Sequence, residues 1–84
     1  MELNHEAIEQ LRRLVADTLG VAEELVNLES GPATLPQWDS FSHIHLIVAL
    51  EERYQIELDV DEIATMISVR EIARVLGQSG AGMK

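Results

Sequence analysis

Cysteine is absent from this 84-residue chain. Its absence excludes disulfides, thiolate metal sites and cysteine nucleophiles, and it is compatible with a reducing compartment such as the cytoplasm. Basic residues are scarce, with 6 Lys and Arg against 15 Asp and Glu, which gives a formal net charge of −9. We expect no nucleic-acid partner, because neutralising phosphates requires a basic face. The acidity suits a protein that meets basic patches on its partners, or one that the charge merely keeps soluble.

The distribution of charged and apolar residues also shows neither a leader segment nor a membrane span. The opening residues, MELNHEAIEQ, show no basic stretch followed by an apolar run. The longest apolar run, Leu46–Leu50, is far too short to cross a bilayer. The length allows one small domain, whose marginal core favours local helical contacts over long-range sheet pairing. We therefore expect a cytoplasmic monomer that makes no contact with membranes.

Apolar residues recur at three- and four-residue spacing and predict an all-α fold, a small four-helix bundle of three main helices and one short helix. Ser68 and Glu71 have the spacing of a capping box at the start of the last helix. The domain should cover residues 1–77, followed by a disordered tail at 78–84. The expected helices span Asn4 to Leu19 before Gly20, Asp39 or Ser40 to Tyr54, Asp61 to Met66, and Ser68 to a stop at Gly77.

The connection from Gly20 to Trp38 is long for a small domain, and such loops are usually functional or contain a short element. One helical turn is expected at the sequence AEEL. The later stretch YQIELDVDE alternates weakly, but a lone strand would have no partner, so we interpret it as a loop. The apolar residues expected to attach the long loop to the core are Val21, Leu25, Val26 and Leu28.

The second long helix has a wider apolar arc than a three-helix core requires. Leu46, Ile47, Leu50 and Tyr54 form the expected buried sector. Phe41, Ile44 and Val48 fall in an adjoining sector, and Ser40, Ile44 and Val48 follow one another at four-residue steps, with Glu51 next. A hydroxyl, two apolar side chains and an acid on one ridge indicate a docking strip for a partner.

Ser40 lies at the start of that helix, where unpaired backbone N–H groups and the positive end of the helix dipole favour an anion. A phosphate bonded to its hydroxyl oxygen would meet this field. Either Asp39 or Ser40 is a good N-cap, so capping alone explains one of the two residues. It does not explain the exposed aromatic ring expected at Phe41.

In the stretch WDSFSHIHLIVALEERYQI, the sequence resembles the acyl carrier and peptidyl carrier protein family. The family's Asp-Ser-Leu attachment motif appears as Asp39-Ser40-Phe41, and the resemblance extends from about Ile8 to Leu76. It implies that Ser40 carries a covalent 4′-phosphopantetheine arm, transferred from coenzyme A by a phosphopantetheinyl transferase. The chain would then catalyse nothing itself, because the arm's thiol holds the acyl or aminoacyl groups as thioesters.

The resemblance also implies partners and a binding surface. A loading enzyme and downstream synthases or transferases, of fatty-acid, polyketide or nonribosomal-peptide type, would use the carrier in turn. As a separate hypothesis, we expect the arm to swing between water and a cleft beside the second and third helices, lined by Ile63, Met66 and Ile67. The residues implied in partner contacts are Asp39, Phe41, Ile44, Val48, Glu51 and Glu52.

Several residues depart from the family pattern. Phe41 replaces the usual leucine, and Ser42 and His45 stand where carriers of fatty-acid synthesis often have acids. Together with Trp38 before the motif, these departures resemble free-standing carriers of secondary metabolism or amino-acid loading. The cargo, the pathway and the loading enzyme stay open, because partners read most of a carrier's specificity.

Other functions fit the residues less well. His43 and His45 are two apart on a helix and face different ways, so they cannot share a metal ion, and surface histidines are the simpler interpretation. Glu57, Asp59 and Asp61 lack the glycine and final glutamate of a calcium loop. A serine hydrolase with His43 as base would require a larger fold. The open alternative is a non-catalytic acidic helical interaction domain without a prosthetic group.

Overall fold

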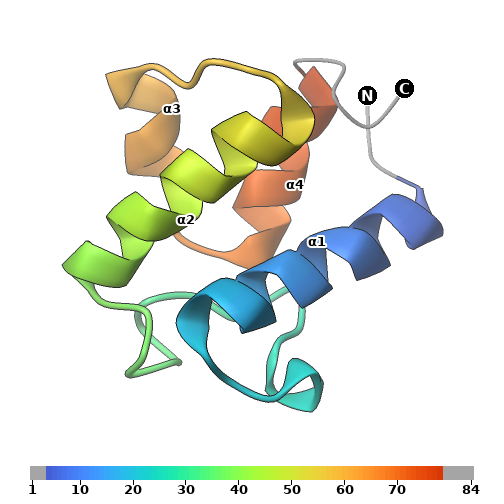
Figure 1. Cartoon of the computed structure of the whole chain (residues 1–84), viewed down its shortest axis with the longest axis vertical. Helices are drawn as coiled ribbons and strands as arrows, with labels where there is room; N and C mark the ends of the chain where they lie inside the picture. The colour runs from blue at the N-terminus through green and yellow to red at the C-terminus, as the bar shows by residue number, and fades with distance from the viewer. Residues whose placement is uncertain (1–3, 79–84) are drawn as a thin grey trace.

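A computed structural model of the chain describes residues 4–78, and within this range its regular structure is entirely helical. The expected bundle of three main helices and one short helix is confirmed. In Figure 1, α2 crosses the view diagonally, with α1 below it and α3 above it. The elements are α1 (His5–Leu19), the 3-10 helix η1 (Glu23–Leu25), α2 (Ser40–Tyr54), α3 (Val60–Thr65) and α4 (Val69–Gln78).

Local signals set both ends of α1, as predicted. The Asn4 side chain accepts a hydrogen bond from the Ala7 N–H at 2.8 Å and so caps the first turn. Gly20 ends the helix in the left-handed conformation, with φ of 72°, which costs little for a residue without Cβ. The helix buries Leu11 and Val15 against the rest of the bundle.

The last helix begins directly after Ser68, where the sequence predicts its start, but the capping box is only half formed and the end of the helix differs from the prediction. The Glu71 N–H donates to Ser68 Oγ at 3.2 Å, but the Glu71 carboxylate pairs with Arg74, so no return bond of the expected capping box is seen. The stop at Gly77 is wrong, because Gly77 is buried inside α4 and the helix continues to Gln78. Gln78 therefore belongs to the helix, and the rest of the expected tail lies outside the described residues.

Helix α3 begins and ends one residue earlier than expected. The cause is a capping box at Asp59, whose carboxylate accepts from the Glu62 N–H at 2.8 Å while Glu62 accepts from the Asp59 N–H at 3.1 Å. The segment between α2 and α3 is a loop, as interpreted from the sequence. It leaves α2 through Gln55, which adopts a left-handed φ of 55°.

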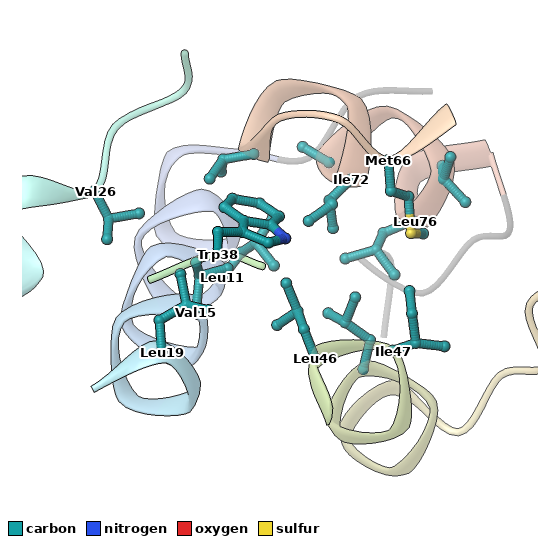
Figure 2. Packing of buried hydrophobic residues seen from close by; sticks show 14 of the residues in the cluster. Leu11, Val15, Leu19, Val26, Trp38, Leu46, Ile47, Met66, Ile72 and Leu76 are labelled. Carbon is teal, nitrogen blue, oxygen red and sulfur yellow. The ribbon is translucent and has the colours of Figure 1, made fainter. Parts of the chain in front are cut away.

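A single apolar core joins the long helices and the loops, as Figure 2 shows for its larger members. The expected buried sector of α2 is confirmed for Leu46, Ile47 and Leu50, and Tyr54 packs against the core while half-buried. Trp38 lies among side chains of α1 and α4 and is buried (Figure 2). The buried apolar residues are Leu11, Val15, Ala16, Leu19, Val26, Trp38, Leu46, Ile47, Leu50, Leu58, Met66, Val69, Ile72, Ala73, Val75 and Leu76.

The first half of the long loop is attached to α1 through η1, the helical turn expected at AEEL. Arg12 Nε donates to the Val26 carbonyl at 2.6 Å, and a second guanidinium nitrogen donates to the Glu23 carbonyl at 3.0 Å. Val26 is buried, whereas the burial expected for Leu25 is wrong, since 56% of it is exposed. One short turn presents only one side to the core, and Val26 occupies it, with Val21 and Leu28 packed alongside.

The second half of the loop is fixed to the start of α4. The Val69 N–H donates to the Ser30 carbonyl and the Arg70 N–H to the Leu28 carbonyl, both at 2.9 Å, so the loop satisfies two N–H groups at this helix start. Gly31 lies so close that a Cβ there would be 2.1 Å from the Ile67 carbonyl oxygen. This contact holds the loop beside the turn between α3 and α4.

Candidate functional site

Asp39 is the N-cap of α2, which resolves the choice between Asp39 and Ser40. Its Oδ1 accepts a hydrogen bond from the Ser42 N–H at 2.9 Å, and its backbone is extended. Hydrogen bonds from Ser42, first from its backbone and then from its side chain, hold the pKa of the Asp39 carboxyl below its ordinary value. The cap stays ionised near neutral pH, and the Ser40 hydroxyl is not needed for capping.

Ser40 is the first residue of α2 and is exposed. No side chain in residues 4–78 forms a hydrogen bond with its hydroxyl, so neither a base nor a competing acceptor engages it there. The first turn of a 15-residue helix lies directly behind it, with the positive end of the helix dipole facing outward. The hydroxyl is therefore available to a modifying enzyme, in a field that favours a negative substituent.

A cleft of about 600 Å³ opens beside Ser40, between the start of α2 and α3. Asp39, Ser40, His43 and Ile44 form one side, and Ile63 and Ala64 from α3 form the other. Met66 and Ile67, from the turn after α3, complete the wall, together with Pro32 and Trp38 from the long loop. The prediction that Ile63, Met66 and Ile67 line a cleft beside the second and third helices is confirmed.

The predicted docking strip on α2 has two exposed apolar side chains, Ile44 and Val48, and Phe41 beside it adds a third. The exposed fractions are 69% for Phe41, 61% for Ile44 and 49% for Val48. The Phe41 ring packs on the His45 ring, with centroids 4.6 Å apart, and this contact holds the aromatic group on the helix surface. The strip begins next to Ser40 and runs along the outer face of α2.

Glu51 of the strip and Glu52, the other acid of this helix implied in partner contacts, differ in their surroundings. Glu52 is exposed. Glu51 is half-buried, and its Oε2 accepts a hydrogen bond from the Leu58 N–H at 2.9 Å, which ties the end of α2 to the loop before α3. A partner would therefore meet a freely solvated carboxylate at Glu52 and a carboxylate already engaged at Glu51.

The sequence analysis interprets His43 as a surface histidine, but in the structure His43 is part of the site. It lines the cleft, and its Nδ1 accepts a hydrogen bond from Trp38 Nε1 at 2.9 Å. The signal was present in the spacing, because His43 precedes Leu46 and Leu50 by one and two helical turns and so points toward the buried side of α2. His45, in contrast, is exposed.

Residues 4–78 contain no group of three or more acids, histidines or cysteines placed to hold a metal ion. Within the same residues, no helix has the length and apolar character needed to cross a membrane.

Comparison with known proteins identifies the family. The family model described as "Phosphopantetheine attachment site" matches residues 9–76. The chain belongs to this family. It is 31% identical over 67 residues to an acyl carrier protein of Campylobacter hominis, covering 80% of this chain and 85% of the relative. It is 33% identical over 78 residues to an acyl carrier protein of Streptomyces coelicolor, covering 88% of this chain and 82% of the relative.

A third relative, an acyl carrier protein of Thermosynechococcus vestitus, is 33% identical over 67 residues, covering 80% of this chain and 83% of the relative. Family membership makes the chain a carrier and not an enzyme, with covalently attached 4′-phosphopantetheine as its prosthetic group. It also supports an acyl carrier role. Members of the family interact with phosphopantetheinyl transferases and with biosynthetic enzymes.

The geometry of the site fits this prosthetic group. An exposed serine hydroxyl at a helix start offers an oxygen for a phosphodiester, and the neighbouring N–H groups suit the phosphate charge. The cleft beside it is lined mainly by apolar side chains, which suit a hydrocarbon cargo. The donor set therefore matches the group in both charge and polarity.

Proposed function

We propose that Ser40 is the residue to which 4′-phosphopantetheine is attached. Three features support the assignment: the hydroxyl is exposed, Asp39 performs the capping in its place, and the cleft opens beside it. In the transfer from coenzyme A, the Ser40 oxygen forms a bond to phosphorus, its proton passes to a base, and the nucleotide half of coenzyme A is the leaving group. In this proposal the transferase supplies that base.

In this function, the chain shuttles acyl or aminoacyl groups between partner enzymes in fatty-acid, polyketide or nonribosomal-peptide-type biosynthesis. The attached group supplies a thiol that holds the cargo as a thioester. The chain's own part is to orient the attachment point, to offer the cleft to the cargo and to present α2 to partners. The absence of cysteine means that no thiol of the chain competes for the cargo. We assign it to the cytoplasm as a monomer.

The partner-facing residues in this proposal surround Ser40. Phe41, Ile44 and Val48 provide an apolar contact of the kind that anchors protein interfaces. Asp39 and Glu52 provide negative charge at the edges, and Glu51 contributes through its position on the same ridge. The transferase, the loading enzyme and the downstream synthases or transferases would use this one surface in succession.

Intact mass tests the attachment. The chain is incubated with coenzyme A and a broad-specificity phosphopantetheinyl transferase, with a known carrier as positive control. We expect the mass to increase by one phosphopantetheinyl group, Ser40→Ala to abolish the increase, and Ser42→Ala, two residues along the same helix, to retain it. An unchanged mass while the control carrier is fully loaded would instead support an interaction domain without a prosthetic group.

A further inference from the structure

The hydrogen bond from the buried Trp38 to His43 determines which ring nitrogen of the neutral His43 carries the proton. Trp38 is only 1% exposed, and its indole N–H can donate but not accept a hydrogen bond. The acceptor is His43 Nδ1 at 2.9 Å, and the two rings are stacked with centroids 6.2 Å apart. A nitrogen that accepts this bond carries no proton, so the neutral imidazole holds its proton on Nε2.

The remaining polar group of the His43 ring has no hydrogen-bond partner within residues 4–78. The ring lines the cleft one helical turn after Ser40 and is half-buried. Around it, Ile44, Ile63 and Met66 give the cleft apolar walls. A hydrogen-bond donor in such surroundings favours a ligand that brings an acceptor oxygen, since an unpaired donor is costly once water is displaced.

We propose that His43 Nε2–H donates a hydrogen bond to a carbonyl oxygen that enters the cleft on the loaded carrier. Trp38 is the positioning residue that holds the imidazole in the donating tautomer. The bond makes the cleft selective for a chain that carries an oxo group over a saturated chain of equal length. This inference depends on the attachment at Ser40, which brings the acceptor to the cleft.

A purely structural role for the pair is the competing explanation. In that case, His43 would only satisfy the buried indole N–H, and its other nitrogen would take no part in binding. The two explanations differ in one observable. Donation predicts that the Nε2 environment changes when a chain with a 3-oxo group is loaded, whereas a structural role predicts no change on loading.

The test uses imidazole nitrogen NMR on four forms of the ¹⁵N-labelled protein: unmodified, with the arm alone, with a saturated acyl chain, and with the 3-oxoacyl chain of equal length. Intact mass verifies each form before measurement. We expect the unmodified protein to show His43 in the Nε2–H tautomer and the 3-oxoacyl form to shift the Nε2 resonance. His45, which is exposed and not among the cleft residues, should not shift and provides the internal control.

Each outcome has a defined meaning. A shift that requires the 3-oxoacyl chain supports the selectivity for an oxo group. A shift that already appears with the arm alone, which carries amide carbonyls, or with the saturated chain, whose thioester carries a carbonyl, would contradict that selectivity. Identical His43 signals in all four forms, or an Nδ1–H tautomer in the unmodified protein, would overturn the inference. Failure of loading, seen as an unchanged mass, would refute the proposed function and this inference together.

Two variants separate positioning from folding. Trp38→Phe should leave the His43 ring in a mixture of tautomers and reduce the difference in shift between the 3-oxoacyl and saturated forms. His45→Phe should keep the full difference in His43 shift between the 3-oxoacyl and saturated forms. Thermal melts of the unmodified variants check folding, and if Trp38→Phe does not fold, the measurements on the unsubstituted protein still decide the question.

Discussion

At the scale of single residues, the site depends on the different roles of the neighbours Asp39 and Ser40. Asp39 accepts the Ser42 N–H and so caps α2, which leaves the Ser40 hydroxyl exposed and without a bond to any side chain within residues 4–78. If Ser40 were the cap, its oxygen would be occupied by a backbone N–H at the moment of modification. The aspartate before the serine therefore keeps the oxygen of the proposed attachment site available.

Asp39 also makes the start of α2 sensitive to acid. Its pKa is lowered in the folded protein by hydrogen bonds from Ser42, so its contribution to stability is complete above its ordinary value of 3.8 and is lost as the pH falls through the lower folded value. The Asp39→Asn variant keeps a capping oxygen but has no carboxyl to titrate. Its stability should therefore fall less than that of the unsubstituted protein when the pH is lowered from about 6 to about 2. Thermal melts at both pH values measure this, and equal losses would contradict it.

Gly31 is the residue whose replacement the backbone tolerates least. A Cβ at this position would lie 2.1 Å from the Ile67 carbonyl oxygen and 3.3 Å from the Ser68 Cα, both of which are main-chain atoms. We expect Gly31→Ala to lower the free energy of unfolding by about 1–3 kcal/mol, as overpacking does. Urea unfolding measures the change, with the exposed Ala33→Ser as control. A loss no greater than that of the control would show that the loop can move away.

At the scale of elements, α2 has two faces that should respond differently to substitution. Ile44→Glu changes the exposed face, so we expect the helicity to stay unchanged. The transferase kcat/KM should fall about tenfold or more, which corresponds to about 1.4 kcal/mol, because the new charge would face an apolar contact. Leu46→Ala changes the fully buried face and should cost about 2–5 kcal/mol of folding stability. Circular dichroism and loading rates measure both, and unfolding of the Ile44 variant would place that residue in the core.

The elements also show where sequence reasoning succeeds. Asn4 and Gly20 determine the ends of α1 through short-range bonds, so the sequence predicts them. Gly77 has the same local signal as Gly20, but tertiary packing buries it within a continuing helix. Several acids lie near the start of α3, and only the capping geometry shows that Asp59 is the one that caps the helix.

The same limit applies to the candidate site. The exposure of Phe41 and Ile44 and the cleft residues Ile63 and Met66 follow from helical periodicity and family resemblance. The hydrogen bond between Trp38 and His43 does not, because it joins a loop residue to the cleft side of α2, and the loop's path is set by distant contacts such as Gly31 with Ile67. The sequence does not determine which side chains pair when one lies on a loop and the other on a helix.

At the scale of the whole molecule, negative charge is unevenly distributed. The first ten residues of α2, 40–49, contain no acid, although the chain has a net charge of −9. In the proposed docking, partners would meet an apolar strip within an acidic molecule, so that charge would guide the approach and apolar contact would hold the docked pair. Much of the positive charge is already engaged, in the ion pairs Arg12–Glu9, Arg13–Glu23, Arg70–Glu29 and Arg74–Glu71.

This excess of acids should make the folded state sensitive to ionic strength. Self-repulsion opposes compaction, and it is screened as the Debye length shortens to about 8 Å at about 0.15 M salt. The exposed ion pairs weaken under the same conditions, but each contributes at most about 1 kcal/mol. We therefore expect the Tm to rise as NaCl increases from low concentration to about 0.15 M.

Glu24→Gln tests the origin of that rise. Glu24 is exposed and takes part in none of the four ion pairs, so the substitution removes repulsion without removing an attraction. The variant should melt at a higher temperature than the unsubstituted protein in low salt, and its Tm should increase less with added NaCl. A Tm that falls with salt in both proteins would mean that the ion pairs of the arginines outweigh the repulsion among the acids.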